Sequence, residues 1–217
     1  MKDGDFIQID YVGKITESGE IFDLTKEDMA KEKGVYIQDF RYGPAPVIIG
    51  ANFVVKGLDN GLKEMQVGEK KTIKIKPEDA FGERDARFVK LLPITEFKKQ
   101  GITPYPGMPV TINRLNGRVL SLSGGRVRVD FNHPLASKMI EYEVEIKDMI
   151  TDVKEKINAI LSFYLKFEKK DVTITIDKET VEINIKMEAS KLVKKTVADT
   201  IKKWISEIKK VRFVDEY

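Results

Sequence analysis

The chain has 217 residues, of which 41% are hydrophobic and 34% charged, and its formal net charge is +3. This composition is typical of a globular protein and excludes a disordered chain. The 38 basic and 35 acidic residues nearly balance, so the pervasive positive charge of a nucleic-acid-binding protein is absent. The lack of cysteine excludes disulfides and thiolate chemistry. No apolar run suits a membrane span or a secretory signal, which predicts a cytoplasmic protein without a membrane partner.

The first 82 residues are predicted to be rich in strands. Strict alternation of apolar and polar residues predicts strands over residues 6–11 and 70–76. Between them, apolar residues at helical spacing predict a short helix over residues 59–65, with Gly68 as its C-terminal cap.

An additional polar stretch follows Leu24. Thr25 is predicted to cap a short helix, with Asp28 three residues later completing a capping-box-like pattern. Tyr36, Phe40 and Tyr42 come next. These aromatic residues either anchor a long loop or supply an aromatic wall to a site, and the sequence leaves both interpretations open.

The pattern changes to short strands with hairpin turns over residues 85–131. Asn-Gly and Gly-Gly pairs between alternating runs predict tight hairpins, because such turns need positive φ angles. The predicted elements are a helix over 94–100, strands over 110–114, 118–122 and 126–131, and turns at 115–117 and 123–125. This segment is expected to form a small all-β module with a thin core.

Residues 151–217 are predicted to form an α+β unit. Asp152 is expected to cap a helix, and alternating runs over 172–176 and 181–187 predict two strands. A longer helix is predicted to carry an apolar face from Leu192 to Ile208, and residues 211–214 to add a strand. So small a unit has a marginal core, and the hairpin is too small to cover the helices. We therefore expect a homodimer formed through this unit.

Several separated motifs carry a family resemblance. They are 11–13 (YVG), 21–23 (IFD), 50–69, 77–82 (PEDAFG) and 142–146 (YEVEI). In this order they resemble the FK506-binding proteins (FKBPs), which are prolyl isomerases. The gap between Gly82 and Tyr142 is too long for a plain FKBP domain. It ends in residues 132–136 (NHPLA), which resemble the SlyD subgroup, where a second small domain is inserted into the flap.

The resemblance implies an α+β fold. It consists of an FKBP-like antiparallel sheet wrapped on a short helix, an inserted small all-β domain and a C-terminal α+β domain. The implied domains are residues 1–85 plus 132–150 (isomerase), 86–131 (insert-in-flap chaperone domain) and 151–217 (association). This long form favours an archaeal source. The implied function is peptidyl-prolyl cis-trans isomerisation that accelerates folding, with unfolded or proline-containing polypeptides as partners and no cofactor.

The resemblance also implies the residues of the site. The catalytic pocket would be formed by Tyr11, Phe22, Asp23, Val54, Val55, Leu58, Phe81 and Tyr142. The backbone N–H after Val54 would hold a substrate carbonyl. FKBPs often have tryptophan in place of Leu58 and tyrosine in place of Phe81, so a shallower pocket with weaker binding of FK506-type macrocycles is expected. Taken singly, the apolar members also fit an ordinary core.

The insert offers its own candidates for binding unfolded chains. Val89, Leu92, Ile102 and Met108 are selected for this role, and they fit the small core of the insert equally well. A lone histidine, His133, cannot build a metal site, so no metal is expected and a hydrogen-bonded turn residue before Pro134 is the preferred interpretation.

Two other functions compete with an active isomerase. One is a holdase chaperone with vestigial isomerase activity; the joint presence of Tyr11, Phe22, Asp23 and Phe81 argues against it. The other is a nucleic-acid or ribosome-binding role for the lysines of the last helix. Lysines opposite an apolar stripe are usually a solvated face, so a nucleic-acid partner is not expected.

Overall fold

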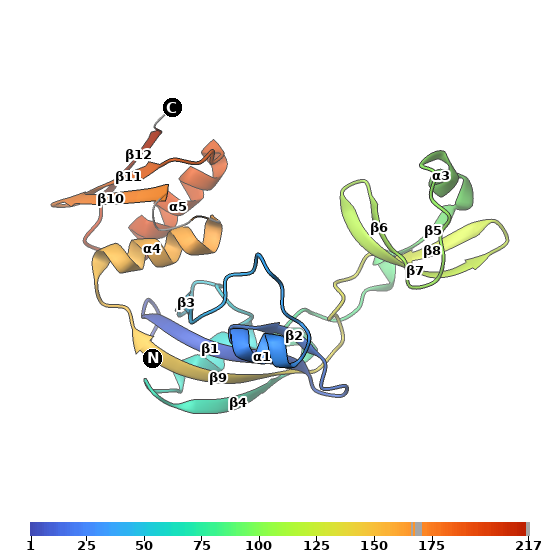
Figure 1. The fold of residues 1–217 in the computed structure, drawn as a ribbon, viewed down its shortest axis with the longest axis horizontal. Helices are drawn as coiled ribbons and strands as arrows, with labels where there is room; N and C mark the ends of the chain where they lie inside the picture. The colour runs from blue at the N-terminus through green and yellow to red at the C-terminus, as the bar shows by residue number, and fades with distance from the viewer. Residues whose placement is uncertain (166, 168–170, 216–217) are drawn as a thin grey trace. The chain divides into compact units, whose positions relative to one another are not determined.

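The computed structural model describes residues 1–165, 167 and 171–215, and the chain divides into two compact units (Figure 1). Unit 1 comprises Met1–Ile75 and Ile140–Tyr217, and unit 2 comprises Lys76–Met139. The C-terminal segment is thus part of the same compact unit as the N-terminal strands.

A five-stranded antiparallel sheet forms the base of unit 1. Its strands run in the order β2-β1-β9-β4, and β3 pairs with β1 beside β2. The elements of this part are β1 (Phe6–Ile15), β2 (Ile21–Leu24), α1 (Glu27–Glu32), β3 (Ala45–Ile48), α2 (Lys56–Lys63), β4 (Lys70–Ile75) and β9 (Ile140–Met149). The expected strands over 6–11 and 70–76 are therefore confirmed, and the first is longer than predicted.

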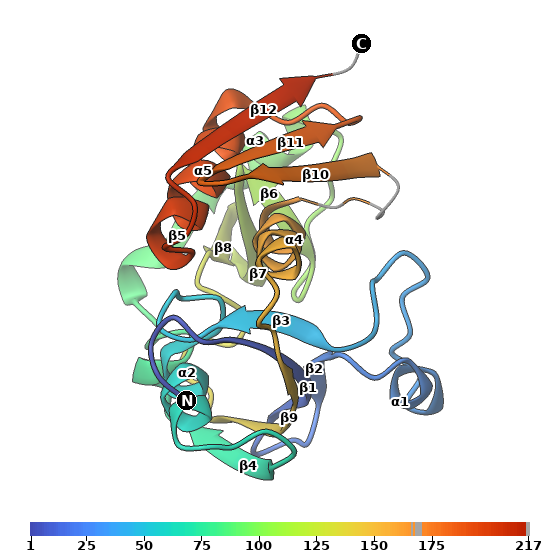
Figure 2. The ribbon, with the colours of Figure 1, turned by 90° about the vertical axis from the view of Figure 1, so that its left-hand side faces the viewer.

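The sheet curves around α2, as Figure 2 shows. Two glycines one helical turn apart allow the helix to lie close to β4. A Cβ at Gly57 would lie 2.3 Å from Cγ2 of Ile75, and one at Gly61 would lie 2.5 Å from Cδ1 of Ile73. Leu58 and Leu62 on the same helix are fully buried. The close approach to β4 and the burial of Leu58 and Leu62 therefore hold the first turn of α2 against the sheet.

Two capping predictions in this part are wrong. α2 ends at Lys63, and Gly68 (φ +84°) instead belongs to the turn into β4, where its N–H donates to the Ile146 carbonyl at 2.7 Å. The N-cap of α1 is Lys26. Thr25 is buried, and its hydroxyl accepts the Tyr11 N–H at 2.9 Å and donates to Asp10 at 3.0 Å. Bonding to β1 competes successfully with helix capping.

The C-terminal part of unit 1 packs two helices on one face of a three-stranded sheet (Figures 1 and 2). The elements are α4 (Val153–Tyr164), β10 (Val172–Asp177), β11 (Thr180–Ile185), α5 (Lys191–Trp204) and β12 (Lys210–Asp215). β10 and β11 are antiparallel, and β12 lies parallel to β11. Asp152 caps α4 by accepting the Glu155 N–H, as predicted. The predicted pattern of two helices and three strands is confirmed.

The core of this part also includes residues from the first sheet. Phe6, Ile48 and Ile150 belong to the same buried cluster as the apolar sides of α4 and α5. Val197 and Ile201 are fully buried, whereas Leu192 is 74% exposed. The expectation that a long apolar stripe of the last helix lies uncovered is wrong, because the chain itself covers most of it.

Unit 2 is a four-stranded antiparallel sheet with one helix. Its strands run in the order β5-β8-β7-β6. The elements are β5 (Val89–Pro93), α3 (Ile94–Lys99), β6 (Pro109–Ile112), β7 (Leu115–Ser123) and β8 (Arg126–Asp130), with 3-10 turns at Pro77–Asp79 and Ala86–Phe88. The core of the sheet and α3 consists of Phe97, Val110, Val119, Val127 and Val129, with half-buried residues around it. The thin core predicted for this module is therefore observed.

The first hairpin of unit 2 turns at a different place than predicted. Ile112 pairs with Leu115, so the turn residues are Asn113 and Arg114, whose φ angles are 51° and 65°. Gly117 lies within β7, where a Cβ would come within 2.7 Å of the Phe131 ring. The second turn, at Gly124-Gly125, is as predicted, with φ angles of 56° and 74°.

Hydrogen bonds join the two segments that lead into and out of this sheet. The Asn132 amide accepts the Asp85 N–H at 2.9 Å and donates to the Asp85 carbonyl at 3.0 Å. Ser137 accepts the Arg84 N–H at 2.7 Å, and Arg84 pairs with Asp130 at 2.6 Å. The side chain of Asn132 thus replaces a strand partner and closes the base of the module.

Candidate functional site

A cavity of about 360 Å³ opens in unit 1 where β1, β2, β9 and the first turn of α2 meet. We call it the Asp23 cavity. It is lined by Tyr11, Asp23, Asn52, Phe53, Val54, Val55, Leu58 and Tyr142. Six of the eight residues selected from the sequence are therefore brought together on one concave surface.

Strand register explains why residues so distant in sequence meet here. Gly13 on β1 lies opposite Asp23 on β2 and opposite Tyr142 on β9. A Cβ at Gly13 would lie 2.8 Å from the Phe22 ring and 3.0 Å from the Tyr142 ring. Phe22 makes an edge contact with Tyr142, with ring centroids 5.7 Å apart. Phe22 is thus the packing partner behind a lining residue, and the missing side chain at Gly13 makes room for both rings.

One hydrogen bond organises the polar side of the cavity. The Tyr11 hydroxyl donates to Oδ2 of Asp23 at 2.8 Å. Burial raises the pKa of Tyr11 well above its usual range, and the nearby Asp23 carboxylate raises it further. Burial also raises the pKa of Asp23, although hydrogen bonds from Tyr11 and the Leu24 backbone oppose this. Tyr11 therefore stays a neutral donor while Asp23 supplies a partly desolvated carboxylate.

The loop that precedes α2 forms the apolar wall. Asn52 has a φ of 59°, which turns the chain so that Val54 and Val55 face the cavity. The Asp59 carboxylate holds this loop by accepting the Gly50 N–H at 2.9 Å. Within the described residues, the Val55 N–H donates no hydrogen bond to the protein. It is a free donor at the edge of an apolar surface.

Phe53 is a lining residue that the sequence analysis missed. Its ring stacks on Phe163 of α4 with centroids 4.0 Å apart and an interplanar angle of 21°, and it meets Tyr164 edge-on. In the sequence, only the position of Phe53 next to Val54 could have indicated that it lines the cavity, because its partner Phe163 lies 110 residues away. The C-terminal part therefore supports the wall of the cavity directly.

Comparison with known proteins decides the family. Sequence models of three families match: FKBP-type peptidyl-prolyl cis-trans isomerase over residues 1–97, the FKBP26 IF domain over 90–135 and the FKBP26 C-terminal domain over 153–217. A short-type peptidyl-prolyl cis-trans isomerase of Methanocaldococcus jannaschii is 30% identical over 149 residues, which are 69% of this chain and 94% of that protein. The chain belongs to the FKBP-type peptidyl-prolyl cis-trans isomerases.

Bacterial relatives support the same assignment. A probable FKBP-type 16 kDa isomerase of Pseudomonas fluorescens is 32% identical over 51% of this chain and 75% of its own length. The FKBP-type isomerase SlyD of Helicobacter pylori is 32% identical over 54% of this chain and 64% of its own length. The resemblance to SlyD-like FKBPs found in the sequence is therefore confirmed, together with matches to an IF domain and a C-terminal domain.

Phe81, the remaining residue selected for the FKBP pocket, lies in unit 2. Its ring stacks on His133 with centroids 4.3 Å apart and an interplanar angle of 2°. Nδ1 of His133 accepts the Leu135 N–H at 3.2 Å, and burial lowers the pKa of this histidine. His133 is thus the hydrogen-bonded turn residue expected before Pro134.

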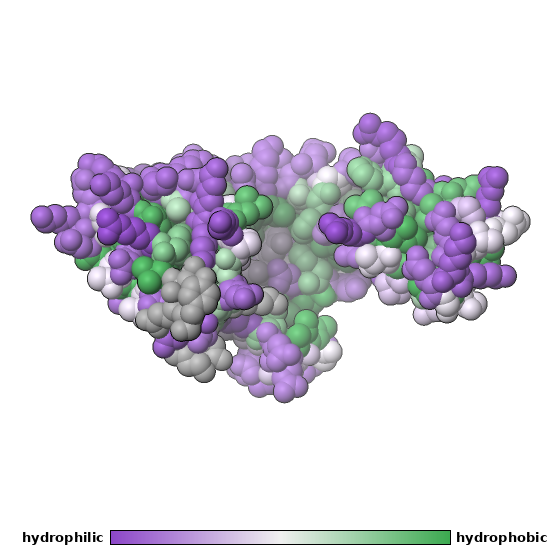
Figure 3. Space-filling model, turned by 90° about the horizontal axis from the view of Figure 1, so that it is seen from above, coloured by the Kyte–Doolittle hydropathy of each residue, from purple (hydrophilic) through white to green (hydrophobic). Residues whose placement is uncertain are grey.

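The four residues selected in the insert are half-buried. Leu92, Ile102 and Met108 pack against its core, and Val89 lies on β5 opposite Asp130. Other apolar side chains of unit 2 are more exposed: Phe88 (51%), Leu91 (55%), Tyr105 (60%) and Leu115 (57%). Figure 3 shows apolar surface between polar side chains on unit 2, at the right of the view.

Tyr42 contacts both Tyr36 and Phe40. Tyr42 stacks on Tyr36 at 5.4 Å, meets Phe40 at 4.9 Å and accepts the Ile37 N–H at 2.9 Å. None of the three is among the residues that line the Asp23 cavity. These contacts fit a loop anchor, and Phe40 and Tyr42 also line another cavity of unit 1.

The described part of the chain lacks two further features. It contains no group of three or more His, Cys, Asp and Glu side chains placed to hold a metal ion. It also contains no helix of the length and apolarity needed to cross a membrane.

Proposed function

We propose that the Asp23 cavity binds an X–Pro segment of an unfolded polypeptide and accelerates its cis-trans isomerisation. The observation that carries this proposal is an apolar wall of Val54, Val55 and Leu58 facing the Tyr11–Asp23 pair in one cavity. A volume of about 360 Å³ lies within the roughly 300–1,000 Å³ that is typical of ligand sites.

The physical basis is differential binding of the twisted peptide bond. Amide resonance sets a rotation barrier of about 18–20 kcal/mol. In the twisted state this resonance is lost, so the carbonyl is less dipolar. It therefore loses less solvation free energy than the planar amide when water is excluded. An apolar cavity therefore favours the twisted state over the planar one without covalent chemistry.

The lining residues take complementary roles in this proposal. Tyr142, with Phe22 behind it, and Leu58 enclose the proline ring, while the Val55 N–H holds a substrate carbonyl. Tyr11 and Asp23 form the polar rim. Because the substrate carbonyl bonds to a backbone donor, its position is independent of any side-chain rotamer.

Protease-free isomerisation of an X–Pro tetrapeptide tests the proposal. Phe22→Ala removes the ring that supports Tyr142 and admits water, so kcat/KM should fall by about tenfold or more, equivalent to roughly 1.4 kcal/mol of transition-state binding. Tyr36→Ala, at an exposed aromatic residue outside the cavity, serves as the matched control and should retain activity. A folded wild-type chain that accelerates no X–Pro peptide would overturn the proposal and leave the holdase alternative.

We also propose that the insert captures unfolded chains. Four exposed apolar side chains of the insert offer contact to an unfolded chain: Phe88, Leu91, Tyr105 and Leu115. Four half-buried apolar residues add to this apolar surface: Val89, Leu92, Ile102 and Met108. A captured chain presents its prolines to the Asp23 cavity at a high effective concentration. This capture supplies affinity that a shallow proline pocket lacks.

Suppression of aggregation of an unfolded protein measures this capture. Leu91→Ser combined with Leu115→Ser should weaken it strongly, because both side chains are more than half exposed and contribute little to the core. Val67→Ser, at a 48% exposed position of unit 1, is the control. If the double variant suppresses aggregation as well as the control and wild type do, another surface captures the unfolded chain.

We further propose that the protein is cytoplasmic and that it self-associates through the C-terminal part. The exposed apolar surface that supports self-association is smaller than the sequence suggested. The apolar faces of α4 and α5 are largely covered, but Leu192 is 74% exposed and Phe163 is 47% exposed. Lys195, Lys202 and Lys203 lie on the exposed side of α5. Sedimentation of Leu192→Glu against a Val67→Glu control tests the homodimer; a wild-type monomer at tens of micromolar would contradict it.

A further inference from the structure

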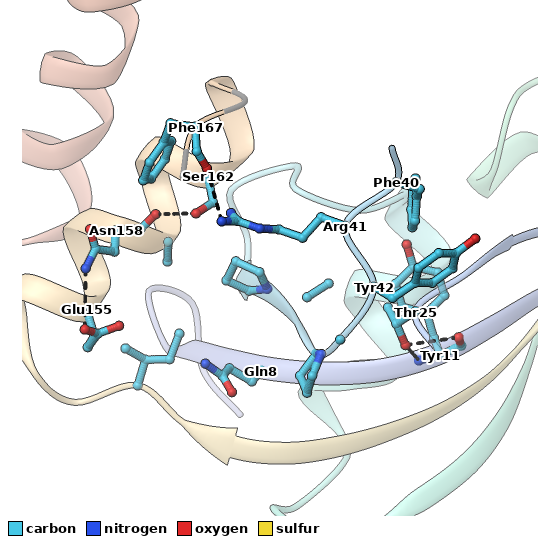
Figure 4. Close-up of a pocket in the computed structure, with 16 residues that line it drawn as sticks. Gln8, Tyr11, Thr25, Phe40, Arg41, Tyr42, Glu155, Asn158, Ser162 and Phe167 are labelled. Atoms are coloured by element: carbon cyan, nitrogen blue, oxygen red, sulfur yellow. Dashed lines mark hydrogen bonds between the residues drawn. The ribbon is translucent and has the colours of Figure 1, made fainter. Parts of the chain in front are cut away.

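A second, larger cavity of about 480 Å³ lies in unit 1 beside α4 (Figure 4). We call it the Arg41 cavity. Its walls come from β1, the loop and strand over residues 40–46, α4 and Phe167. The side chains labelled in Figure 4 are Gln8, Tyr11, Thr25, Phe40, Arg41, Tyr42, Glu155, Asn158, Ser162 and Phe167.

The two cavities share one residue. Tyr11 lines both of them. Its hydroxyl bonds to Asp23 in the Asp23 cavity, whereas its backbone N–H donates to Thr25, which lines the Arg41 cavity. The two cavities therefore adjoin at Tyr11.

The walls of the Arg41 cavity suit a polypeptide. Phe40, Tyr42 and Phe167 present aromatic surface, and Gln8 and Asn158 present amides that both donate and accept hydrogen bonds. Arg41 and Glu155 are single charges of opposite sign on different walls. This neutral mixture complements the alternating donors and acceptors of a peptide backbone. One arginine among carboxylate and amide groups is too little positive charge for a phosphate-rich ligand.

Arg41 retains donors for a ligand. One guanidinium nitrogen donates to the Phe167 carbonyl at 3.1 Å, and the group carries five N–H donors in all. The bond to Phe167 fixes the side chain across the cavity, as Figure 4 shows. An arginine held in this way loses less conformational entropy when it binds a further carbonyl.

The neighbouring strand offers a template for an extended chain. β3 pairs with β1 along one edge, and within the described residues it pairs with no other strand. Ala45 and Pro46 of β3 line the Arg41 cavity. Extended peptides commonly bind beside such edges. Because Pro46 has no N–H, this edge offers a peptide carbonyl acceptors and apolar contact rather than a complete strand ladder.

We propose that the Arg41 cavity is a second subsite for the same polypeptide, holding an extended segment next to the proline that occupies the Asp23 cavity. This inference rests on the proposed isomerase function of the Asp23 cavity. It assigns to the junction of the FKBP sheet and the C-terminal part a role in substrate binding. Substrates that extend beyond the proline then bind more tightly than minimal X–Pro peptides.

Calorimetric titration of the full-length chain with three peptides tests the subsite. The peptides are an X–Pro tetrapeptide and two peptides of about twelve residues, roughly 40 Å when extended, with the proline near one end or the other. At least one long peptide should bind about tenfold more tightly than the tetrapeptide, a gain of roughly 1.4 kcal/mol. Equal affinity of all three would overturn the inference.

Two variants locate the effect. Asn158→Tyr places a bulky ring in the Arg41 cavity, and Arg41→Ala removes the fixed guanidinium. Both should abolish most of the advantage of the long peptide and leave tetrapeptide isomerisation within about twofold of wild type. Lys154→Tyr, at an exposed residue one turn earlier on α4 that does not line the cavity, is the matched control.

The outcomes separate the two proposals. A tetrapeptide that wild type does not isomerise refutes the proposed function itself. An active wild type whose long-peptide advantage survives both variants refutes the subsite alone. Equal losses for tetrapeptide and long peptide also refute it, because the variants would then act through the shape of the Asp23 cavity.

Discussion

The Asp23 cavity and the surface of the insert differ in how their side chains are held. The cavity takes one residue from each of three strands and from α2, and four from the loop over residues 52–55. The Tyr11–Asp23 hydrogen bond, the Phe53–Phe163 stack and the burial of Leu58 and Tyr142 hold these side chains. The insert buries few residues completely and leaves Phe88, Leu91, Tyr105 and Leu115 more than half exposed. Selective binding of one twisted bond needs fixed geometry, whereas capture of many unfolded chains needs apolar surface that adapts. Under the proposed functions, unit 1 isomerises the X–Pro bond and unit 2 captures the unfolded chain.

Removing the insert should have the largest effect, because it should impair catalysed refolding and spare tetrapeptide isomerisation. Replacing residues 87–130 by a short Gly-Ser linker leaves every residue of the Asp23 cavity in place. Loss of tethering should slow catalysed refolding of a proline-limited protein by about 100-fold. Tetrapeptide isomerisation by the same variant should change little. If refolding and peptide activity fall together, the insert acts on the cavity itself rather than on capture.

Close packing of α2 offers a test of the independence of the two units. Gly57→Ala places a methyl group against Ile75, so unit 1 should lose about 1–3 kcal/mol of unfolding free energy. The core of unit 2 shares no residue with this contact and should unfold as before. Hydrogen exchange resolved by residue distinguishes the two units. Gly124→Ala, in a hairpin turn of unit 2 with positive φ, should show the reverse pattern.

The stacked pair Phe53–Phe163 connects the cavity to the C-terminal part. Phe163→Ala removes the ring that supports Phe53 and should lower tetrapeptide kcat/KM about three- to tenfold, chiefly through kcat, because the wall rather than the substrate contact is altered. Leu192→Ala removes an exposed apolar side chain of the same part and is the control. Unchanged kinetics with Phe163→Ala would show that the loop over residues 50–55 holds its shape alone.

The smallest expected effect is the pH dependence set by Asp23. Its raised pKa means that the folded protein binds this proton more tightly than the unfolded chain. Its contribution to the unfolding free energy therefore grows as pH falls through the raised pKa and is complete below the ordinary value of about 3.9. Relative to Asp23→Asn, wild type should gain stability between pH 7 and pH 4.

Chemical denaturation of both proteins at several pH values measures this gain. Asp39→Asn, at an exposed carboxylate, controls for the general effect of removing a negative charge. A wild type that loses stability relative to Asp23→Asn as pH falls would show that the Tyr11 hydrogen bond outweighs burial.

The sequence predicted most elements because their signals are local. Asp152 and the alternation over β10 and β11 were sufficient for the start of α4 and for the C-terminal hairpin. The failures involve distant partners. Thr25 has the residue type of a cap, but in the fold its hydroxyl accepts the N–H of Tyr11 on a neighbouring strand, and no local pattern indicates that partner. Gly117 follows an asparagine as a turn residue would, yet contact with Phe131 explains it.

The site shows the same division. Tyr11, Asp23 and Tyr142 were found because ordered motifs resemble an FKBP domain, and the structure places them together. Phe53 was missed because its significance depends on Phe163, and no periodicity joins these two residues. The Arg41 cavity was unpredictable for the same reason, since α4 and β3 meet only through tertiary packing.

Exchange spectroscopy on an X–Pro tetrapeptide in the presence of the full-length chain tests the central claim most directly. We expect cis-trans exchange cross-peaks at catalytic protein concentrations, together with backbone shift changes concentrated at Tyr11, Asp23, Val55, Leu58 and Tyr142. Exchange that stays at the uncatalysed rate, or catalysis accompanied by shift changes confined to residues 76–139, would contradict the assignment of the activity to the Asp23 cavity.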